Sequence, residues 1–175
     1  MGFLQLLTTD GGTATSTTTN SAPFGTPTAS PTESTPTPTA TLPPFTYSDP
    51  QSLEQATVLE VIDGDTIVVL IGSEAQRVRY YGIDAPDKGK QCFNEATERN
   101  RELVGRTVRL KSDVRDQDDS GRLLRYVFTE EGLSVDAALV TEGLAKAWRQ
   151  DGFYRDPLIG LEDHARTQDI GCLWK

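Results

Sequence analysis

The sequence predicts a β-rich α+β fold, a five-stranded barrel with about three packed helices, preceded by a disordered tail. Three observations lead to this expectation. The composition changes near residue 50, short runs rich in Val and Ile then follow between turn residues, and later segments place apolar residues at helical spacing. Residues 51–175 are expected to form one domain, because about 125 residues suffice for a single hydrophobic core.

The first fifty residues have the composition of a spacer. They contain eight of the ten prolines and fifteen threonines, but only three charged residues. Such a segment cannot bury enough apolar surface to offset the entropy of its chain. We therefore expect residues 1–50 to be a disordered Thr/Ser/Pro-rich tail or linker that the domain does not need for folding.

Five short runs have the length and composition of strands. They are 56–62, 66–71, 76–83, 107–111 and 123–128. The first two flank Asp-Gly-Asp at 63–65, which is a strong hairpin signal. The third ends where Pro86 follows, because proline is unfavourable inside a strand.

Three later segments are predicted to be helices. They are 94–104, 134–142 and 157–168. Gly105 and Gly143 end the first two, and Pro157 suits the first turn of the last. The order of three strands, one helix, two strands and two helices fits a Greek-key barrel of the OB-fold type.

Charge argues against a protein that holds nucleic acid through bulk attraction. All 17 basic residues lie after residue 50 together with 23 of the 26 acidic ones, so the domain carries a net charge of about −6. A metal-dependent site with a local arginine cluster remains compatible with this composition.

The two cysteines bear on the compartment. Cys92 and Cys172 belong to no CxxC pair and the chain has one histidine, which excludes a structural zinc site. Two spaced cysteines behind a stalk-like tail predict a disulfide between them and a secreted or cell-surface protein, with two buried free thiols as the alternative. The sequence contains no membrane-spanning segment and no recognisable signal peptide.

Three polar motifs stand out in the domain. They are DGDT at 63–66, RYYGIDAPD at 79–87 and DDSGR at 118–122. Each alone is typical of a solvated turn or loop. Together, and in this order, they resemble the staphylococcal nuclease family (thermonuclease, micrococcal nuclease) over residues 54 to 175. GLAK at 143–146 agrees with that resemblance.

The resemblance implies a calcium site. Asp65 and Asp84 would ligate Ca²⁺ through their carboxylates, the Ala85 carbonyl would add a ligand, and Asp63 would act through water. Such an all-oxygen ligand set suits a hard cation. The family usually has Thr at the position of Ala85, but a backbone ligand survives that change.

The resemblance also implies the catalytic residues. Arg79 and Arg122 would clamp the phosphate, since a guanidinium is always charged and gives bidentate contacts. Asp87 stands where the family has the glutamate that positions the attacking water. One methylene fewer shortens its reach by roughly 1.3–1.5 Å, and a misplacement near 1 Å can cost about 10²-fold in rate.

Contacts to the bases differ from the family pattern. Ser120, Arg149 and Asp151 stand where the staphylococcal enzyme has tyrosines. Phe153 or Tyr154 could supply base stacking instead, although both are equally compatible with a packing role.

The resemblance implies a calcium-dependent endonuclease that acts on DNA and RNA, with single strands preferred, leaves 3′-phosphate ends and works as a monomer. The alternative is a catalytically weak or inactive nucleic-acid-binding module on the same barrel, because fold does not fix function. Retention of both arginines and both metal carboxylates favours the enzyme, and Asp87 favours the alternative.

Overall fold

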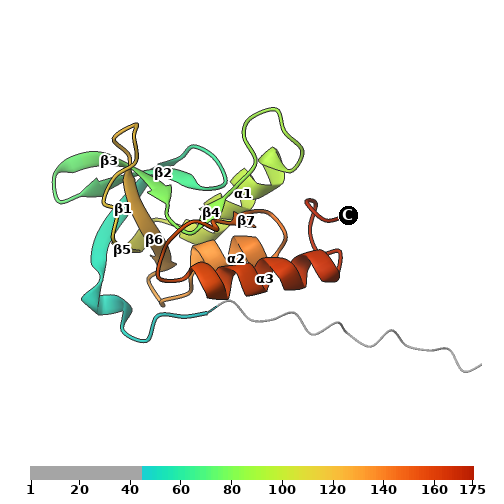
Figure 1. Cartoon of the computed structure of the whole chain (residues 1–175). Coiled ribbons are helices and arrows are strands. Elements are labelled where there is room, and N and C mark those ends of the chain that lie inside the picture. The colour runs from blue at the N-terminus through green and yellow to red at the C-terminus, as the bar shows by residue number, and fades with distance from the viewer. Residues whose placement is uncertain (1–44) are drawn as a thin grey trace, which may run out of the picture. The chain divides into compact units, whose positions relative to one another are not determined.

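The computed structural model describes residues 45–175. The predicted tail over 1–44 lies outside the described residues. Five strands close a barrel in the order β1-β2-β3-β6-β5, in which β3 and β6 run parallel and the other neighbours antiparallel (Figure 1). They are β1 (Glu54–Val61), β2 (Thr66–Ile71), β3 (Glu74–Tyr80), β5 (Thr107–Lys111) and β6 (Leu123–Thr129). The predicted five-stranded barrel is confirmed.

The third strand ends earlier than the sequence predicts. β3 stops at Tyr80, and Ile83–Asp84 forms a separate short strand, β4, paired with β7 (Lys146–Ala147). Gly82 is the break. A Cβ there would lie 2.4 Å from a methyl group of Leu158, so only glycine lets the chain pass this close to α3 (Arg155–Thr167). After the break, Ile83 and Asp84 pair with β7 and do not extend the barrel.

Three α-helices cover the barrel, as predicted. α1 (Phe93–Val104) and α3 each bury one face, whereas every residue of α2 (Val135–Thr141) is buried. The Ser134 hydroxyl caps α2 by accepting a hydrogen bond from the Ala137 N–H at 3.1 Å. α2 lies between the barrel and α3 and packs against both (Figure 1). Within the described residues no helix is long and apolar enough to cross a membrane.

The packed part of the chain begins before the predicted boundary at residue 51. The Phe45 ring stacks on Tyr154 at a centroid distance of 4.8 Å, and Tyr47 packs against Phe128. The Tyr47 N–H also donates to the Gly132 carbonyl at 2.7 Å. Two aromatic residues among the prolines and threonines therefore give this end of the predicted tail something to bury, which its average composition does not show.

The expected disulfide is present between Cys92 and Cys172, whose Cα atoms are 5.7 Å apart. It joins the residue before α1 to the end of the chain, across a separation of 80 residues. The Gln91 side chain adds a hydrogen bond to the Cys172 carbonyl. The loop that precedes α1 is thereby fixed to the C-terminal segment.

Removing this bond should lower stability more than activity. Because the bond closes a long loop, Cys172→Ser should cost on the order of 4 kcal/mol in the chain-entropy model. Urea unfolding of the oxidised wild type and the variant measures this difference. The wild type with dithiothreitol should match the variant, and an equal midpoint for all three samples would contradict the prediction.

One buried carboxylate holds α2 to the barrel. Asp136 is fully buried, and its Oδ2 accepts the Val127 N–H at 2.9 Å. Its Oδ1 has no hydrogen-bond partner among the described residues. Burial raises the pKa of Asp136 to about 7, against the opposing effects of nearby backbone N–H groups and of the charge on Arg79.

This burial gives stability a defined pH dependence. Below the ordinary pKa of 3.8 both states hold the proton, between 3.8 and about 7 only the native state holds it, and above 7 the native state carries a buried charge. The contribution is therefore lost as pH rises through 7. Relative to Asp136→Asn, the wild type should lose on the order of 1–4 kcal/mol between pH 4 and pH 8, measured by urea unfolding at each pH. Parallel stability curves for the two proteins would refute this.

Candidate active site

The hairpin turn between β1 and β2 positions the first carboxylates. The Asp65 N–H donates to Asp63 Oδ1 at 3.0 Å, which closes the turn. A Cβ on Gly64 would lie 2.7 Å from the Cβ of Ala85 and 2.8 Å from that of Ala96, so glycine is required where the turn meets α1. The Asn100 side chain on α1 donates to the Asp63 carbonyl at 2.8 Å and holds the turn from below.

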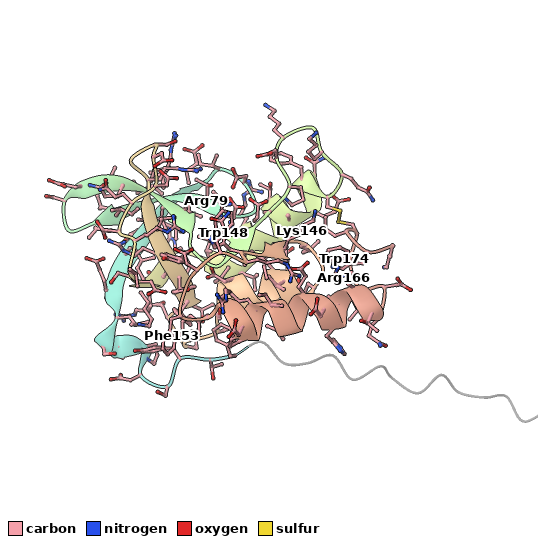
Figure 2. The ribbon with its side chains drawn as sticks, viewed as in Figure 1. Arg79, Lys146, Trp148, Phe153, Arg166 and Trp174 are labelled. Atoms are coloured by element: carbon pink, nitrogen blue, oxygen red, sulfur yellow. A yellow bond between two sulfur atoms is a disulfide. The ribbon has the colours of Figure 1, made fainter. Side chains whose placement is uncertain are left out.

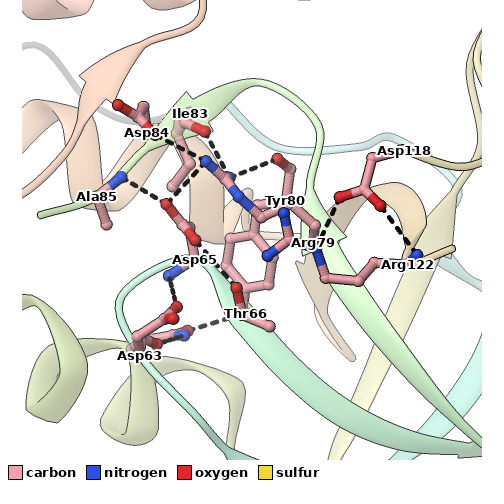
Figure 3. Close-up of polar contacts among 11 residues, drawn as sticks. Asp63, Asp65, Thr66, Arg79, Tyr80, Ile83, Asp84, Ala85, Asp118 and Arg122 are labelled. Atoms are coloured by element: carbon pink, nitrogen blue, oxygen red, sulfur yellow. Dashed lines mark hydrogen bonds and ion pairs between the residues drawn. The ribbon is translucent and has the colours of Figure 1, made fainter. Parts of the chain in front are cut away.

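Asp65 is the buried centre of the site, with a side chain only 7% exposed. Its Oδ2 accepts the Ala85 N–H at 2.5 Å and lies 3.1 Å from Arg79 Nη2, while its Oδ1 accepts the Thr66 hydroxyl (Figure 3). Burial raises the pKa of Asp65 to about 7, although the charge of Arg79 and the Ala85 N–H both oppose the rise. Arg79 and the Ala85 N–H therefore offset only part of the cost of burying an ionised Asp65.

Arg79 connects the two carboxylates that were predicted to bind metal. Its Nη2 contacts Asp65 and also donates to Asp84 Oδ1 at 2.8 Å, while its Nη1 donates to the Ile83 carbonyl at 2.7 Å (Figure 3). Arg79 is 14% exposed and Asp84 is 61% exposed, so the pair spans from the interior to the surface. One guanidinium thus serves two carboxylates.

Arg122 is held in place by its own loop. Its Nε donates to Asp118 Oδ2 at 2.7 Å, and the backbone N–H groups of Arg122 and Ser120 donate to Asp118 Oδ1. Burial raises the pKa of Asp118, but these hydrogen bonds outweigh it and hold the pKa below its usual value. The DDSGR motif is therefore a device that fixes one arginine.

Two pockets meet at this site. The arginine pocket, of about 230 Å³, is lined by Arg79, Arg122 and a third arginine, Arg115, with Tyr81 and Trp148. The lysine pocket, of about 340 Å³, is lined by Asp84, Ala85, Asp87, Lys90 and Lys146. Because Arg79 binds Asp84, the two pockets are neighbours.

The structure separates Asp87 from the predicted arginine clamps. Asp87 is exposed and lines the lysine pocket, whereas Arg79 and Arg122 line the arginine pocket. Its side chain makes no hydrogen bond or ion pair with the residues that the structure describes, and its carbonyl accepts the Lys90 N–H at 2.9 Å.

Three residues of the arginine pocket escaped the sequence prediction. Arg115, Tyr81 and Trp148 line the pocket but were not named as site residues, and Trp148 is half-buried there. Asp151 brings them together, because it accepts hydrogen bonds from all three side chains. The one available signal was a lone arginine in the acidic stretch after β5.

The residues fit a hard cation in chemistry and charge. Asp63, Asp65 and Asp84 offer only oxygen donors, which Ca²⁺ prefers, and they outnumber the one nearby guanidinium. Between residues 45 and 175, however, no three such side chains already converge on one point. The Ala85 N–H, not its carbonyl, contacts Asp65. A cation between Asp65 and Asp84 would compete with Arg79 Nη2 for the same oxygens.

The barrel and its arginine–carboxylate site define a class of OB-type nuclease domains, and comparison with known proteins agrees. The family described as "Staphylococcal nuclease homologue" matches residues 77–175. Similar proteins include Protein ParB of Escherichia coli, 38% identical over 67% of this chain and 70% of the relative. An uncharacterized endonuclease of Escherichia coli O157:H7 is 36% identical over 67% of this chain and 74% of the relative. Micrococcal nuclease of Shigella flexneri is 32% identical over 67% and 71%. The chain belongs to the staphylococcal nuclease homologue family, which confirms the resemblance.

Proposed function

We propose that this protein is a calcium-dependent endonuclease that hydrolyses phosphodiester bonds of single-stranded DNA and RNA and leaves 3′-phosphate ends. Membership of the family makes the chain a hydrolase of the nuclease class, and several relatives are named endonuclease or micrococcal nuclease. The observation that carries the proposal is Arg79, held between Asp65 and Asp84 and lining one pocket with Arg122.

Two arginines in one pocket suit a phosphodiester. Hydrolysis passes through a transition state with charge on the phosphoryl oxygens, and fixed guanidinium groups stabilise that charge. Arg122 is oriented by Asp118, and Arg79 by Asp84 and two backbone carbonyls. Arg122 is already oriented beside the pocket, whereas Arg79 must exchange one of its four contacts for the phosphate. The two arginines are assigned as the catalytic clamps.

The attacking water belongs at the border of the two pockets. Asp84 and Asp87 line the lysine pocket, on the side of Arg79 away from Arg122. Asp87 is assigned the role of positioning or deprotonating that water, since its carboxylate is exposed and uncommitted. Asp65, Asp84 and Asp63 would hold Ca²⁺, which when bound supplies charge neutralisation at the phosphate. The Ala85 carbonyl is a proposed further ligand.

The disulfide supports a proposal for the compartment. A Cys92–Cys172 bond persists in oxidising surroundings, which supports a secreted or cell-surface enzyme. Calcium is also plentiful enough for weak sites outside cells. We further propose that the domain acts as a monomer, because its site is built from one chain.

Activity should require Ca²⁺. Excess EGTA should abolish digestion of heat-denatured DNA, added Ca²⁺ should restore it, and Mg²⁺ should support it poorly because it demands tighter octahedral geometry. Asp65→Asn should raise the Ca²⁺ concentration that is needed for half-maximal activity, because one metal ligand loses its charge. Exposed Glu130→Gln, on the turn after β6, is the matched control. Undiminished digestion in EGTA would refute the metal requirement.

Asp87 should limit turnover through its short reach. Asp87→Glu should raise kcat several-fold at unchanged KM, because it adds a methylene without changing charge. Asp87→Ala should lower kcat by about 10²-fold, and Arg79→Ala and Arg122→Ala by at least as much. Single-turnover cleavage of a labelled oligonucleotide measures these rates. An Asp87→Ala variant with wild-type kcat would remove Asp87 from the mechanism. A wild type and an Asp87→Glu variant both inert with calcium would favour the binding module.

A further inference from the structure

An exposed aromatic side chain is held on a rigid loop outside the two pockets. Phe153 is 73% exposed and lies well away from Arg79 (Figure 2). The ring of its neighbour Tyr154 is packed, because it stacks on Phe45 and lies edge-on against Tyr126. Of the two aromatic residues that the sequence offered for base stacking, only Phe153 has a largely exposed ring, which packs edge-on against Tyr154 at a centroid distance of 5.0 Å.

Three contacts fix the loop that carries Phe153. Asp151 accepts four side-chain hydrogen bonds, including two from Arg115 at 2.6 and 2.9 Å. Gly152 has φ +115°, and a Cβ there would lie 2.4 Å from the Tyr126 hydroxyl. The Phe153 N–H donates to Asp113 Oδ2 at 2.6 Å. The backbone of Phe153 is therefore held in place, with its ring at the surface.

Positive charge accompanies the ring and connects it with the arginine pocket. The Lys111 ammonium lies 5.7 Å from the centroid of the Phe153 ring. Arg115 stacks on Tyr81 at 5.1 Å, lines the arginine pocket, and is bound to Asp151, two residues before Phe153. The side chain of Val114, between Lys111 and Arg115 in sequence, is 92% exposed. Cations and aromatic faces thus continue from the pocket to Phe153.

We propose that Phe153 and Lys111 form a second nucleotide-binding subsite, in which a base of a single strand stacks on Phe153 while Lys111 and Arg115 meet its phosphates. The subsite rests on the proposed nuclease function and deepens it. Basic groups interleaved with exposed aromatic rings are the usual means of holding single strands without sequence preference. A duplex cannot use Phe153 in this way, because its bases are already stacked. The subsite therefore favours single-stranded substrates longer than those that fill the two pockets.

Substrate length separates this subsite from the catalytic centre. The wild-type KM should fall as an oligonucleotide grows from a dinucleotide to a ten-nucleotide strand that reaches Phe153. In Phe153→Ala the ratio of the short-strand KM to the long-strand KM should shrink about tenfold, since one base–aromatic contact is lost. Phe153→Trp should preserve the ratio. Leu59→Ala, which removes an exposed apolar side chain on β1, is the matched control and should preserve it also.

Direct binding provides the second measurement and does not depend on cleavage. Fluorescence anisotropy of a labelled ten-nucleotide strand should show an approximately tenfold rise in Kd for Phe153→Ala. Lys111→Gln should reduce the slope of log Kd against log salt by about 0.7, as expected for one lost phosphate contact. Equal KM ratios and equal Kd values for Phe153→Ala and the wild type would overturn the subsite. A wild type that cleaves nothing but shows this Kd loss would overturn only the catalytic proposal.

Discussion

The site depends on one buried carboxylate, Asp65. The surrounding residues must offset the cost of burying its charge. An ionised group so far from water is costly unless charge and hydrogen bonds are supplied to it. Ala85 supplies an N–H and Arg79 a guanidinium, and each of these comes from a segment that is itself anchored to the barrel. Gly64 and Gly82 leave the space that brings these segments together. The local architecture of β2, β3 and β4 can be understood as the surroundings of this group.

The shared use of Arg79 links metal chemistry to phosphate chemistry. Because one guanidinium contacts both Asp65 and Asp84, the two carboxylates are only partly neutralised, and a cation and Arg79 would compete for the same oxygens. Such competition would leave Arg79 more available to the arginine pocket. Removing Arg79 therefore has a second consequence besides lost phosphate contact, since Asp65 would keep its burial and lose its only cationic partner among the described residues.

The sequence was sufficient for the fold because its signals were local. Valine-rich runs, an Asp-Gly turn and glycine stops gave five strands and three helices to within a few residues of their observed bounds. Two features depended on tertiary contacts and were missed. β3 stops at Tyr80 because of how α3 passes Gly82, and Phe45 and Tyr47 are packed by aromatic partners more than 80 residues away. No local pattern carries that information.

The sequence predicted only those residues of the candidate site that belong to the three motifs. Arg79 contacts both Asp65 and Asp84, three residues that the motifs supplied, but the motifs did not show that Asp87 and the arginines line different pockets. The wall made by Tyr81, Arg115 and Trp148 is assembled by Asp151. Asp151 had been noticed only as a departure from the family tyrosines. Asp151 replaces an aromatic residue of the family, but its carboxylate holds together another set of aromatic and basic side chains.

The net negative charge of the domain is a weaker argument against nucleic-acid binding once the positions of the carboxylates are known. Asp136 binds the Val127 N–H, Glu162 the Ala147 N–H and Asp113 the Phe153 N–H. These groups act as backbone acceptors, and others are paired with arginines at short range, so their fields are partly cancelled before they reach a ligand. What a polynucleotide meets is the local field of the two pockets and of Lys111 beside Phe153. Net charge describes the whole domain, whereas affinity is decided at a few fixed guanidinium and ammonium groups.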